Sequence, residues 1–323
     1  MGRDGGLDVL EEIGLSAFEF VIQAEGQLLL PEYKGSTLRG AFGHAFKQVA
    51  CPLKGRPCPT CLLGPKCAYF TIFETPPPPD ARRLRKYSNI PHPFVLLPPS
   101  EPKQVYAPGE SLSFGLRLVG RAADYLPYFV LAFSELGKVG LGKGRGCYRL
   151  QEVFGLEGQS RRRRLYSKEK GALLGSPTTH YPGRPRQEDH DRKALSLRFL
   201  TPTRIRYQED LCLDLEFHIL ARSLMRRLSA LAYFHCSLDP EGWDFRGWIA
   251  RAEGVGLSRR ELRWYDWERY SARQDRRMML GGFVGEASFV GDLGPFMPLI
   301  RLGEWLHVGK GTSFGLGRYE VVG

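Results

Sequence analysis

The 323-residue sequence contains no uninterrupted apolar run that approaches the roughly 20 residues needed to cross a bilayer as a helix. Its first residues, Met-Gly-Arg-Asp-Gly-Gly, contain no apolar signal region. Gly6 also occupies the position where an N-myristoylation motif has Ser or Thr. These absences predict a cytoplasmic protein that makes no membrane contact.

Two common nucleotide-binding motifs are also missing. A P-loop has four residues between its two glycines, but five residues separate Gly303 from Gly309. Lys310 is moreover followed by Gly311 instead of Ser or Thr. The dinucleotide-binding pattern fails because Phe314 stands in place of its third glycine. The glycines near the C-terminus therefore form neither of these two mononucleotide or dinucleotide cradles.

Positive charge is in excess, because 46 Lys and Arg residues outnumber 35 Asp and Glu residues, for a net charge of +11. This excess favours a polyanionic partner such as nucleic acid. The composition is that of a globular protein, and the length predicts two domains with a core each. The seven cysteines are an odd number, and four of them cluster, which indicates a reducing compartment and no disulfide framework.

Two glycine-rich, cationic segments lie about half the chain apart. The first runs over residues 140–148 and the second over residues 309–319, and each joins an apolar, helix-like stretch to a short strand. Successive N–H groups in such a loop can form an anion site, to which Lys310 and Arg318 would add charge. A tight hairpin bordered by solvated cations would have the same residues. The repetition nevertheless indicates an internal duplication.

Each half of the chain has the same expected order of elements, β-α-β-β-α-β, which is the ferredoxin-like plan. We predict an α+β fold of two tandem ferredoxin-like domains, at residues 1–154 and 194–323, with glycine-rich loops and a four-cysteine insertion at 51–67. Residues 155–193 are rich in Ser, Gly, Pro and mixed charge, and include the run Arg161–Arg164. We expect them to form a linker or a mobile insertion.

An amphipathic helix is expected at about residues 36–49, and its apolar stripe consists of Leu38, Phe42, Ala45, Phe46 and Val49. His44 and Lys47 fall on the opposite face, where side chains three positions apart can act on one ligand. A histidine beside a lysine suits acid–base chemistry on phosphate esters. An ordinary surface histidine would show the same spacing.

Four cysteines lie within 17 positions, namely Cys51, Cys58, Cys61 and Cys67. Their spacing is typical of a structural zinc knuckle in which all four ligands are thiolates. Four ligands close the coordination tetrahedron, so the metal would be a scaffold and would not take part in catalysis. An iron–sulfur cluster has the same ligand count, and four unmetallated cysteines are a further alternative.

Together these features resemble the RAMP superfamily of CRISPR-associated proteins, and most of all its CRISPR repeat-processing endoribonucleases with a cysteine knuckle. The likeness extends over nearly the whole chain and is weakest at residues 155–193. The matching segments are residues 38–44 (Leu-Arg-Gly-Ala-Phe-Gly-His), the four cysteines, and residues 106–110, 140–146, 199–202 and 305–319.

The resemblance implies an enzyme that cuts precursor CRISPR RNA within its repeats, without a catalytic metal. In this family a general base deprotonates the 2′-OH next to the scissile bond, and the products carry a 2′,3′-cyclic phosphate and a 5′-OH. His44 matches the family's helix histidine and would be the base or the acid. Tyr33 and Lys47 match its tyrosine and lysine partners, whose placement differs among members. The residues expected to bind RNA are Arg39, Lys143, Arg145, His307, Lys310 and Arg318.

Two other functions fit parts of the same pattern. A non-catalytic RAMP subunit that holds a guide RNA would keep the glycine loops and the charge but would need no histidine. A zinc-organised protein-interaction module would show no salt-dependent affinity for RNA. For the endoribonuclease and for the RAMP subunit, the expected partners are CRISPR repeat RNA and other CRISPR effector subunits.

Overall fold

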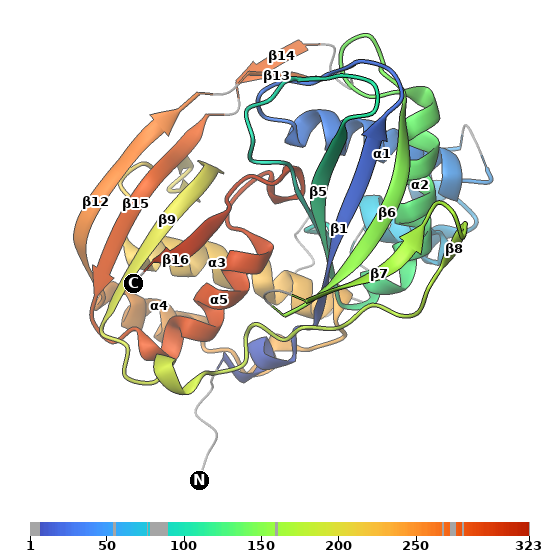
Figure 1. Cartoon of the computed structure of the whole chain (residues 1–323). Helices are drawn as coiled ribbons and strands as arrows, with labels where there is room; N and C mark the ends of the chain where they lie inside the picture. Colours follow the sequence, from blue (N-terminus) through green and yellow to red (C-terminus); the bar gives the residue numbers. More distant parts are fainter. Residues whose placement is uncertain are drawn as a thin grey trace. The chain divides into compact units, whose positions relative to one another are not determined.

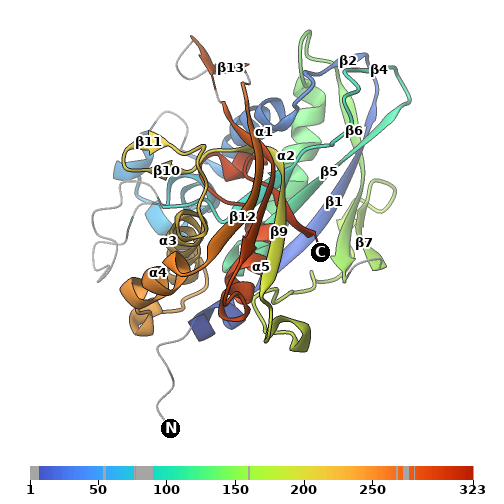
Figure 2. The same ribbon diagram turned by 90° about the vertical axis from the view of Figure 1, so that its left-hand side faces the viewer.

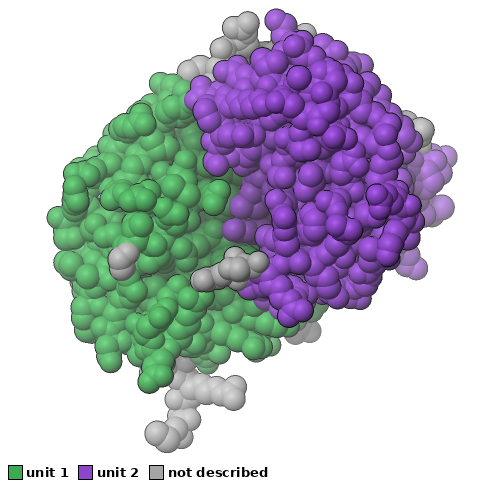
Figure 3. Space-filling model, in the orientation of Figure 1, with its two compact units in different colours: residues 1–14, 181–323 green, residues 15–180 purple. Residues whose placement is uncertain are grey.

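The computed structural model describes residues 7–53, 56–75, 77, 90–158, 161–266, 268–271, 276–279 and 281–322. The chain divides into two compact units, coloured separately in Figure 3. Unit 2 is the continuous segment Leu15–His180, whereas unit 1 combines Met1–Gly14 with Tyr181–Gly323. The short 3-10 helix Leu7–Glu12 accordingly contacts the helix Met297–Leu306. The N-terminal residues thus fold with the C-terminal half, whereas the first domain was expected to begin at residue 1. Unit 2 also ends at His180 and not at the expected boundary of residue 154.

Unit 2 is built on a six-stranded antiparallel sheet with the strand order β3-β5-β1-β6-β7-β8, and α1 and α2 cover one face of it (Figures 1 and 2). A small ladder pairs β2 with β4. The elements are β1 (Leu15–Ala24), β2 (Leu28–Leu29), α1 (Gly35–Ala50), β3 (Phe94–Leu97), β4 (Val105–Tyr106), β5 (Ser111–Val119), α2 (Leu126–Val139), β6 (Tyr148–Glu157), β7 (Arg161–Ser167) and β8 (Ala172–Leu173).

Unit 1 contains a four-stranded antiparallel sheet with the order β12-β15-β9-β16, and two short hairpins pair β10 with β11 and β13 with β14. Its elements are β9 (Ala194–Thr203), β10 (Arg206–Tyr207), β11 (Asp210–Leu211), α3 (Phe217–His235), α4 (Phe245–Glu253), β12 (Gly256–Tyr265), β13 (Glu268–Ser271), β14 (Arg276–Met279), β15 (Gly282–Val290), α5 (Met297–Leu306) and β16 (Tyr319–Val322). In chain order, the four core strands are β1, β3, β5 and β6 in unit 2 and β9, β12, β15 and β16 in unit 1. Across both sheets they lie in the same order, namely second, third, first and fourth. This shared topology confirms the predicted pair of ferredoxin-like folds.

Residues 155–193 differ from the expected linker. They contribute β7 and β8 to the sheet of unit 2, where β7 pairs with β6 over Arg161–Ser167. The exposed arginines of β7 pair with glutamates of the same sheet: Arg164 bonds Glu152 of the adjacent β6 (2.8 Å), and Arg162 bonds Glu19 of β1, two strands away (2.8 Å). A run of like charge in a sequence does not reveal such cross-strand partners.

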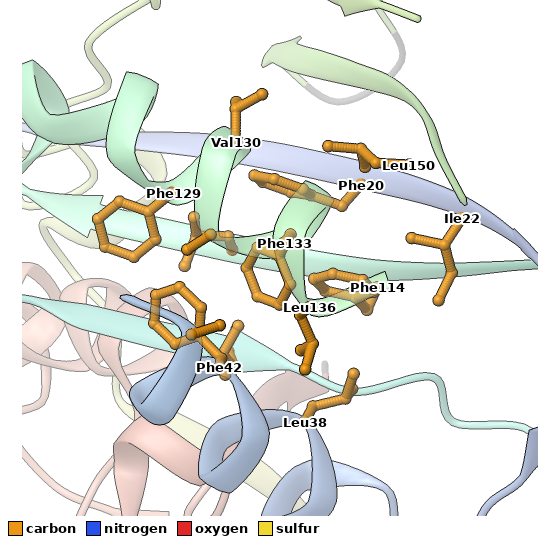
Figure 4. Packing of buried hydrophobic residues seen from close by; sticks show 14 of the residues in the cluster. Phe20, Ile22, Leu38, Phe42, Phe114, Phe129, Val130, Phe133, Leu136 and Leu150 are labelled. Atoms are coloured by element: carbon orange, nitrogen blue, oxygen red, sulfur yellow. The ribbon is translucent and has the colours of Figure 1, made fainter. Parts of the chain in front are cut away.

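The core of unit 2 lies between the two helices and the sheet, where a group of stacked aromatic rings is surrounded by aliphatic side chains (Figure 4). Phe42 of α1 stacks on Phe133 of α2, with ring centroids 4.6 Å apart, and Phe133 in turn contacts Phe114 of β5. The predicted apolar stripe of α1 faces this core, since Leu38, Phe42, Ala45 and Phe46 are buried. This packing leaves His44 and Lys47 exposed on the outer face of the helix.

A tyrosine ties each glycine-rich segment back to the helix before it. The hydroxyl of Tyr148 donates to the carbonyl oxygen of Phe133 in α2 (2.8 Å), and that of Tyr319 donates to the carbonyl oxygen of Ile300 in α5 (2.7 Å). A glycine on each helix permits the approach. A β-carbon on Gly137 would lie 2.2 Å from the backbone oxygen of Tyr148, and one on Gly303 would lie 2.0 Å from the hydroxyl oxygen of Tyr319. The two units therefore repeat one another in side-chain contacts as well as in strand order.

Candidate nucleic-acid interface and active site

The outer face of α1 presents His44 and Lys47 to solvent. Side chains three positions apart on a helix have β-carbons about 5–6 Å apart, so both can reach one phosphate. Gly40, one turn before His44, leaves the adjacent surface flat, since a β-carbon there would meet nothing within 4 Å. An exposed imidazole, a neighbouring ammonium group and open space beside them can accommodate a large anionic substrate.

Lys47 is held in place by an aromatic ring that sequence reasoning did not identify. Its Nζ lies 5.2 Å from the ring centroid of Tyr69, and Tyr69 stacks on Phe73 with the centroids 5.1 Å apart. Burial, reinforced by the charge of Glu74, raises the pKa of Tyr69 to about 12. Tyr69 therefore keeps its hydroxyl proton at neutral pH and adds no negative charge that would bind Lys47 in place of a substrate.

Tyr33 lies two residues before the first residue of α1, Gly35, and is half-buried. His44 lies nine residues after Gly35, about 14 Å along the helix axis at a rise of 1.5 Å per residue. The part of Tyr33 in catalysis stays a prediction.

Lys34, next to Tyr33, has a buried position that the sequence did not reveal. Its Nζ donates to the carbonyl oxygens of Glu101 (2.8 Å) and Glu32 (3.2 Å), and burial lowers the pKa of this lysine. The hydroxyl of Tyr106 donates to the carboxylate of Glu101 (2.7 Å). Lys34 thus anchors the start of α1 to the segment before β4, and no periodicity in the sequence distinguishes it from an exposed lysine.

Arg39 lies against aromatic side chains on the flank of α1. Its guanidinium group is 4.9 Å from the ring centroid of Phe73, and its Nη2 donates to Nε2 of His92 (3.2 Å). Gly43 provides the necessary room, because a β-carbon there would lie 2.9 Å from the guanidinium. Arg39 is half-buried as a result, and RNA binding by this residue stays a prediction. His92, which lies far from α1 in the sequence, was missed because only the fold brings it there.

The four clustered cysteines are all partly exposed and free of disulfides. Within the described part of the chain, no group of three or more His, Cys, Asp or Glu residues has the geometry of a metal site. Burial raises the pKa of Cys58, with smaller contributions from Glu74, Cys51 and Cys67. The expected metal therefore stays a prediction.

The glycine-rich loops differ from the expected anion sites formed by backbone amides. Most of their N–H groups bond to the protein's own carbonyl oxygens. The amide of Lys143 donates to Leu29 (2.9 Å) and that of Lys310 donates to Arg204 (2.9 Å), which are equivalent contacts in the two units. The glycines are needed because they adopt positive φ, as at Gly142 (78°) and Gly309 (82°), and allow backbones to pack closely. Any anion is therefore bound mainly by the side chains of these loops.

Three of the predicted RNA-binding side chains on these loops are exposed, namely Lys143, Arg145 and Lys310. Arg318 is half-buried, and its amide donates to the hydroxyl of Thr201 (2.9 Å). His307 is different, because its side chain is fully buried and its Nδ1 lies 3.1 Å from the carbonyl oxygen of Leu316. We no longer assign RNA binding to His307, since it has no exposed surface and stabilises the loop from within.

Two glycines of the first loop allow a matched test of this packing. Gly142 and Gly144 both have positive φ (78° and 79°), but a β-carbon on Gly142 would lie 2.2 Å from the Leu29 carbonyl oxygen, whereas one on Gly144 would meet nothing within 4 Å. Gly144→Ala should cost about 1–2 kcal/mol for the left-handed backbone alone. Gly142→Ala should cost about 1–3 kcal/mol more through the clash. Denaturant unfolding measures both, and equal losses would show that the loop does not dock on β2.

Comparison with known proteins gives one family match in each unit. The AF_1859_N family model, described as an N-terminal domain, matches residues 13–178, and the model of the CRISPR-associated endoribonuclease Cas6 matches residues 197–319. Residues 197–319 therefore form a domain of the Cas6 family of CRISPR-associated endoribonucleases. The resemblance to the RAMP superfamily is thereby confirmed, while membership in a subgroup with a cysteine knuckle stays a prediction.

Solved Cas6 structures share the fold at low sequence identity. A Cas6 product complex is 18% identical, with a TM-score of 0.54, and the match covers 95% of this chain and 100% of that one. Thermus thermophilus Cas6 is 17% identical, with a TM-score of 0.52 and coverage of 96% and 99%. A partial Cas6-RT-Cas1–Cas2 complex is 12% identical, with a TM-score of 0.56, and the match covers 96% of this chain and 46% of that one. At such identities the likeness concerns the fold alone.

One curated relative, an uncharacterized protein of Archaeoglobus fulgidus, is 29% identical over 115 residues. The match covers 36% of this chain and 38% of that protein, well under half of either. Among the described residues, no helix is both long and apolar enough to span a membrane.

Proposed function

We propose that this chain, through its Cas6 domain and the unit that precedes it, cleaves precursor CRISPR RNA within its repeats, without a catalytic metal. The observation that carries the proposal is the exposed pair of His44 and Lys47 on α1. A general base removes the proton of the 2′-OH beside the scissile phosphate, and that oxygen attacks phosphorus in line. The bond from phosphorus to the 5′ oxygen breaks as an acid protonates the leaving oxygen. The products carry a 2′,3′-cyclic phosphate and a 5′-OH.

His44 serves as the base or the acid in this scheme, because its exposed imidazole can reach a bound phosphate ester. Lys47 stabilises the negative charge that builds up on the pentavalent phosphorus, and its contact with Tyr69 limits the conformations it must give up on binding. Tyr33, just before α1, is the third proposed member of the site, and its hydroxyl would contact the substrate or His44.

The exposed cations Lys143, Arg145 and Lys310, with Arg318 and the part of Arg39 that is accessible, would hold the RNA backbone. Contacts of this kind release counterions, so affinity should fall as salt rises. One structural neighbour is a Cas6 in a complex with RT, Cas1 and Cas2, and we include other CRISPR proteins among the proposed partners of this chain.

The proposed activity is tested by incubating the purified protein with end-labelled repeat RNA in excess EDTA. Cleavage under these conditions supports the endoribonuclease. Tight, salt-sensitive binding without cleavage would instead support a non-catalytic RAMP subunit that holds a guide RNA. If the protein neither cleaves nor binds the repeat RNA, only a protein-interaction role is left for the chain.

We also propose that Cys51, Cys58, Cys61 and Cys67 hold a structural metal, with zinc favoured over an iron–sulfur cluster. Elemental analysis should find about one zinc ion per chain, because four thiolates complete its coordination. Cys58→Ser should lose most of this zinc and lower the Tm, whereas Cys147→Ser, an exposed cysteine outside the cluster, should retain it. Protein purified without zinc and with unchanged stability would refute the proposal, and visible absorption with bound iron would indicate the cluster.

A further inference from the structure

Four cationic side chains from three separate segments of unit 1 gather beside the second glycine-rich loop. Lys310 comes from the loop itself, Arg204 and Arg206 follow β9, and Arg226 lies on α3. The pKa of Lys310 is lowered, first by burial and then by the positive charges of Arg206, Arg204 and Arg226. Each of the three arginines therefore lies near enough to Lys310 to act on its charge. We refer to Arg204, Arg206, Arg226 and Lys310 as the cation cluster.

The backbone holds the cation cluster together. The amide of Lys310 donates to the carbonyl oxygen of Arg204 (2.9 Å). Gly309 makes this contact possible, since it has a φ of 82° and a β-carbon on it would lie 2.5 Å from that same oxygen. The loop therefore docks on the chain where it leaves β9, and this docking brings Lys310 to the two arginines.

The hairpin of β10 and β11 fixes the position of Arg206. Its Nε donates to the carbonyl oxygen of Glu209 (2.9 Å) across a two-residue turn. Both turn residues are non-glycine yet have positive φ, 47° at Gln208 and 73° at Glu209. Such conformations persist only where their surroundings enforce them, and they often accompany functional sites.

The cation cluster lacks the counter-charges that other arginines of the same unit have. Arg198, Arg251 and Arg301 each form an ion pair with a carboxylate. Among the described residues, no carboxylate lies within ion-pairing distance of the cation cluster, and the Nε atom of Arg204 is buried without a hydrogen-bond partner. Like charges held together in this way are stabilised when a bound anion neutralises them.

We infer that the cation cluster is a binding site for the phosphodiester groups of RNA, formed jointly by the second glycine-rich loop, the segment after β9 and α3. The inference rests on the proposed RNA-processing function, and it adds Arg204, Arg206 and Arg226 as RNA-contacting residues. A guanidinium group recognises phosphate oxygens without reading bases. The site therefore contributes affinity that does not depend on sequence, in a different unit from His44.

The test uses the full-length double variant Arg206→Gln and Arg226→Gln, two exposed side chains whose loss leaves the core intact. The dissociation constant for repeat RNA is measured at several salt concentrations. Each lost phosphate contact should reduce the slope of log affinity against log salt by about 0.7, the value for single strands. The double variant should therefore lose about 1.4 of the slope, and its affinity should fall equally for repeat and scrambled RNA.

The matched control is Arg251→Gln, which removes a positive charge of the same unit that is already neutralised by Asp292 (3.3 Å). Its salt slope should equal that of the wild-type protein. If the wild type binds and cleaves RNA but the double variant keeps the full slope and affinity, the cation cluster is not an RNA site and the proposed function still stands. If the wild type shows no salt-dependent RNA binding at all, the proposed function itself fails.

Discussion

His44→Ala should reduce single-turnover cleavage of repeat RNA by about 10²–10⁴-fold, the usual contribution of a positioned acid–base histidine. Binding of the repeat should be nearly unchanged, because His44 is exposed and makes no contact that stabilises the core. The experiment uses excess enzyme, so that the observed rate reports cleavage and neither product release nor association. Affinity is measured separately at the same salt concentration, with RNA that carries a 2′-deoxy nucleotide at the cleavage site.

Gln48→Ala is the matched control, since Gln48 is also exposed on α1 but has no proton to transfer near neutral pH. This variant should cleave at the wild-type rate. If His44→Ala also cleaves at that rate, His44 is an ordinary surface histidine. His92, paired with Arg39 on the flank of α1, would then be the next histidine to replace.

Asp189→Ala should lower the free energy of unfolding by about 3–5 kcal/mol, the usual cost of leaving one partner of a buried ion pair uncompensated. Asp189 is only 3% exposed and accepts two hydrogen bonds from Arg301, from Nε at 2.8 Å and from Nη2 at 2.7 Å. Its removal leaves the largely buried guanidinium group of Arg301 with only the exposed carboxylate of Glu188 as a charge partner. Urea denaturation followed by circular dichroism measures the change.

Glu188 provides the control for this prediction, because it bonds the same guanidinium group (2.9 Å) from an exposed position with 64% side-chain accessibility. Glu188→Ala should cost no more than about 1 kcal/mol, as expected for solvent-exposed pairs. Similar losses in the two variants would show that the contact between the 3-10 helix Gln187–Asp189 and α5 is not buried in solution.

The alternation of apolar residues in strands and their helical periodicity in helices were sufficient to predict the fold, because each core element turns one face toward a single apolar layer. Residues 18–24 alternate as β1 requires, and the stripe from Leu38 to Phe46 points into the core as predicted. The extension of the sheet by β7 could not be predicted in the same way. Its stability depends on glutamates such as Glu19, which is far away in the sequence.

The candidate site could be predicted only where it depends on local spacing. His44 and Lys47 share a helix face because they are three residues apart, and the structure exposes both. The burial of Lys34 depends instead on a hydrogen bond to the distant carbonyl oxygen of Glu101. The burial of His307 depends on its packing inside the second glycine-rich loop, against the carbonyl oxygen of Leu316. The cation cluster was missed for the same reason, since Arg226 and Lys310 are far apart in the sequence and only the fold places the charge of Arg226 near Lys310.

The most direct test of the proposed chemistry is cleavage, in EDTA, of a repeat RNA that carries one 2′-deoxy nucleotide immediately upstream of the scissile phosphate. We predict that the protein binds this RNA as tightly as the unmodified repeat but does not cut it, while the unmodified repeat yields a 2′,3′-cyclic phosphate and a 5′-OH. Cleavage of the deoxy-substituted RNA, or cleavage of the unmodified repeat only when a divalent metal is added, would contradict attack by the 2′-OH and the role assigned to His44.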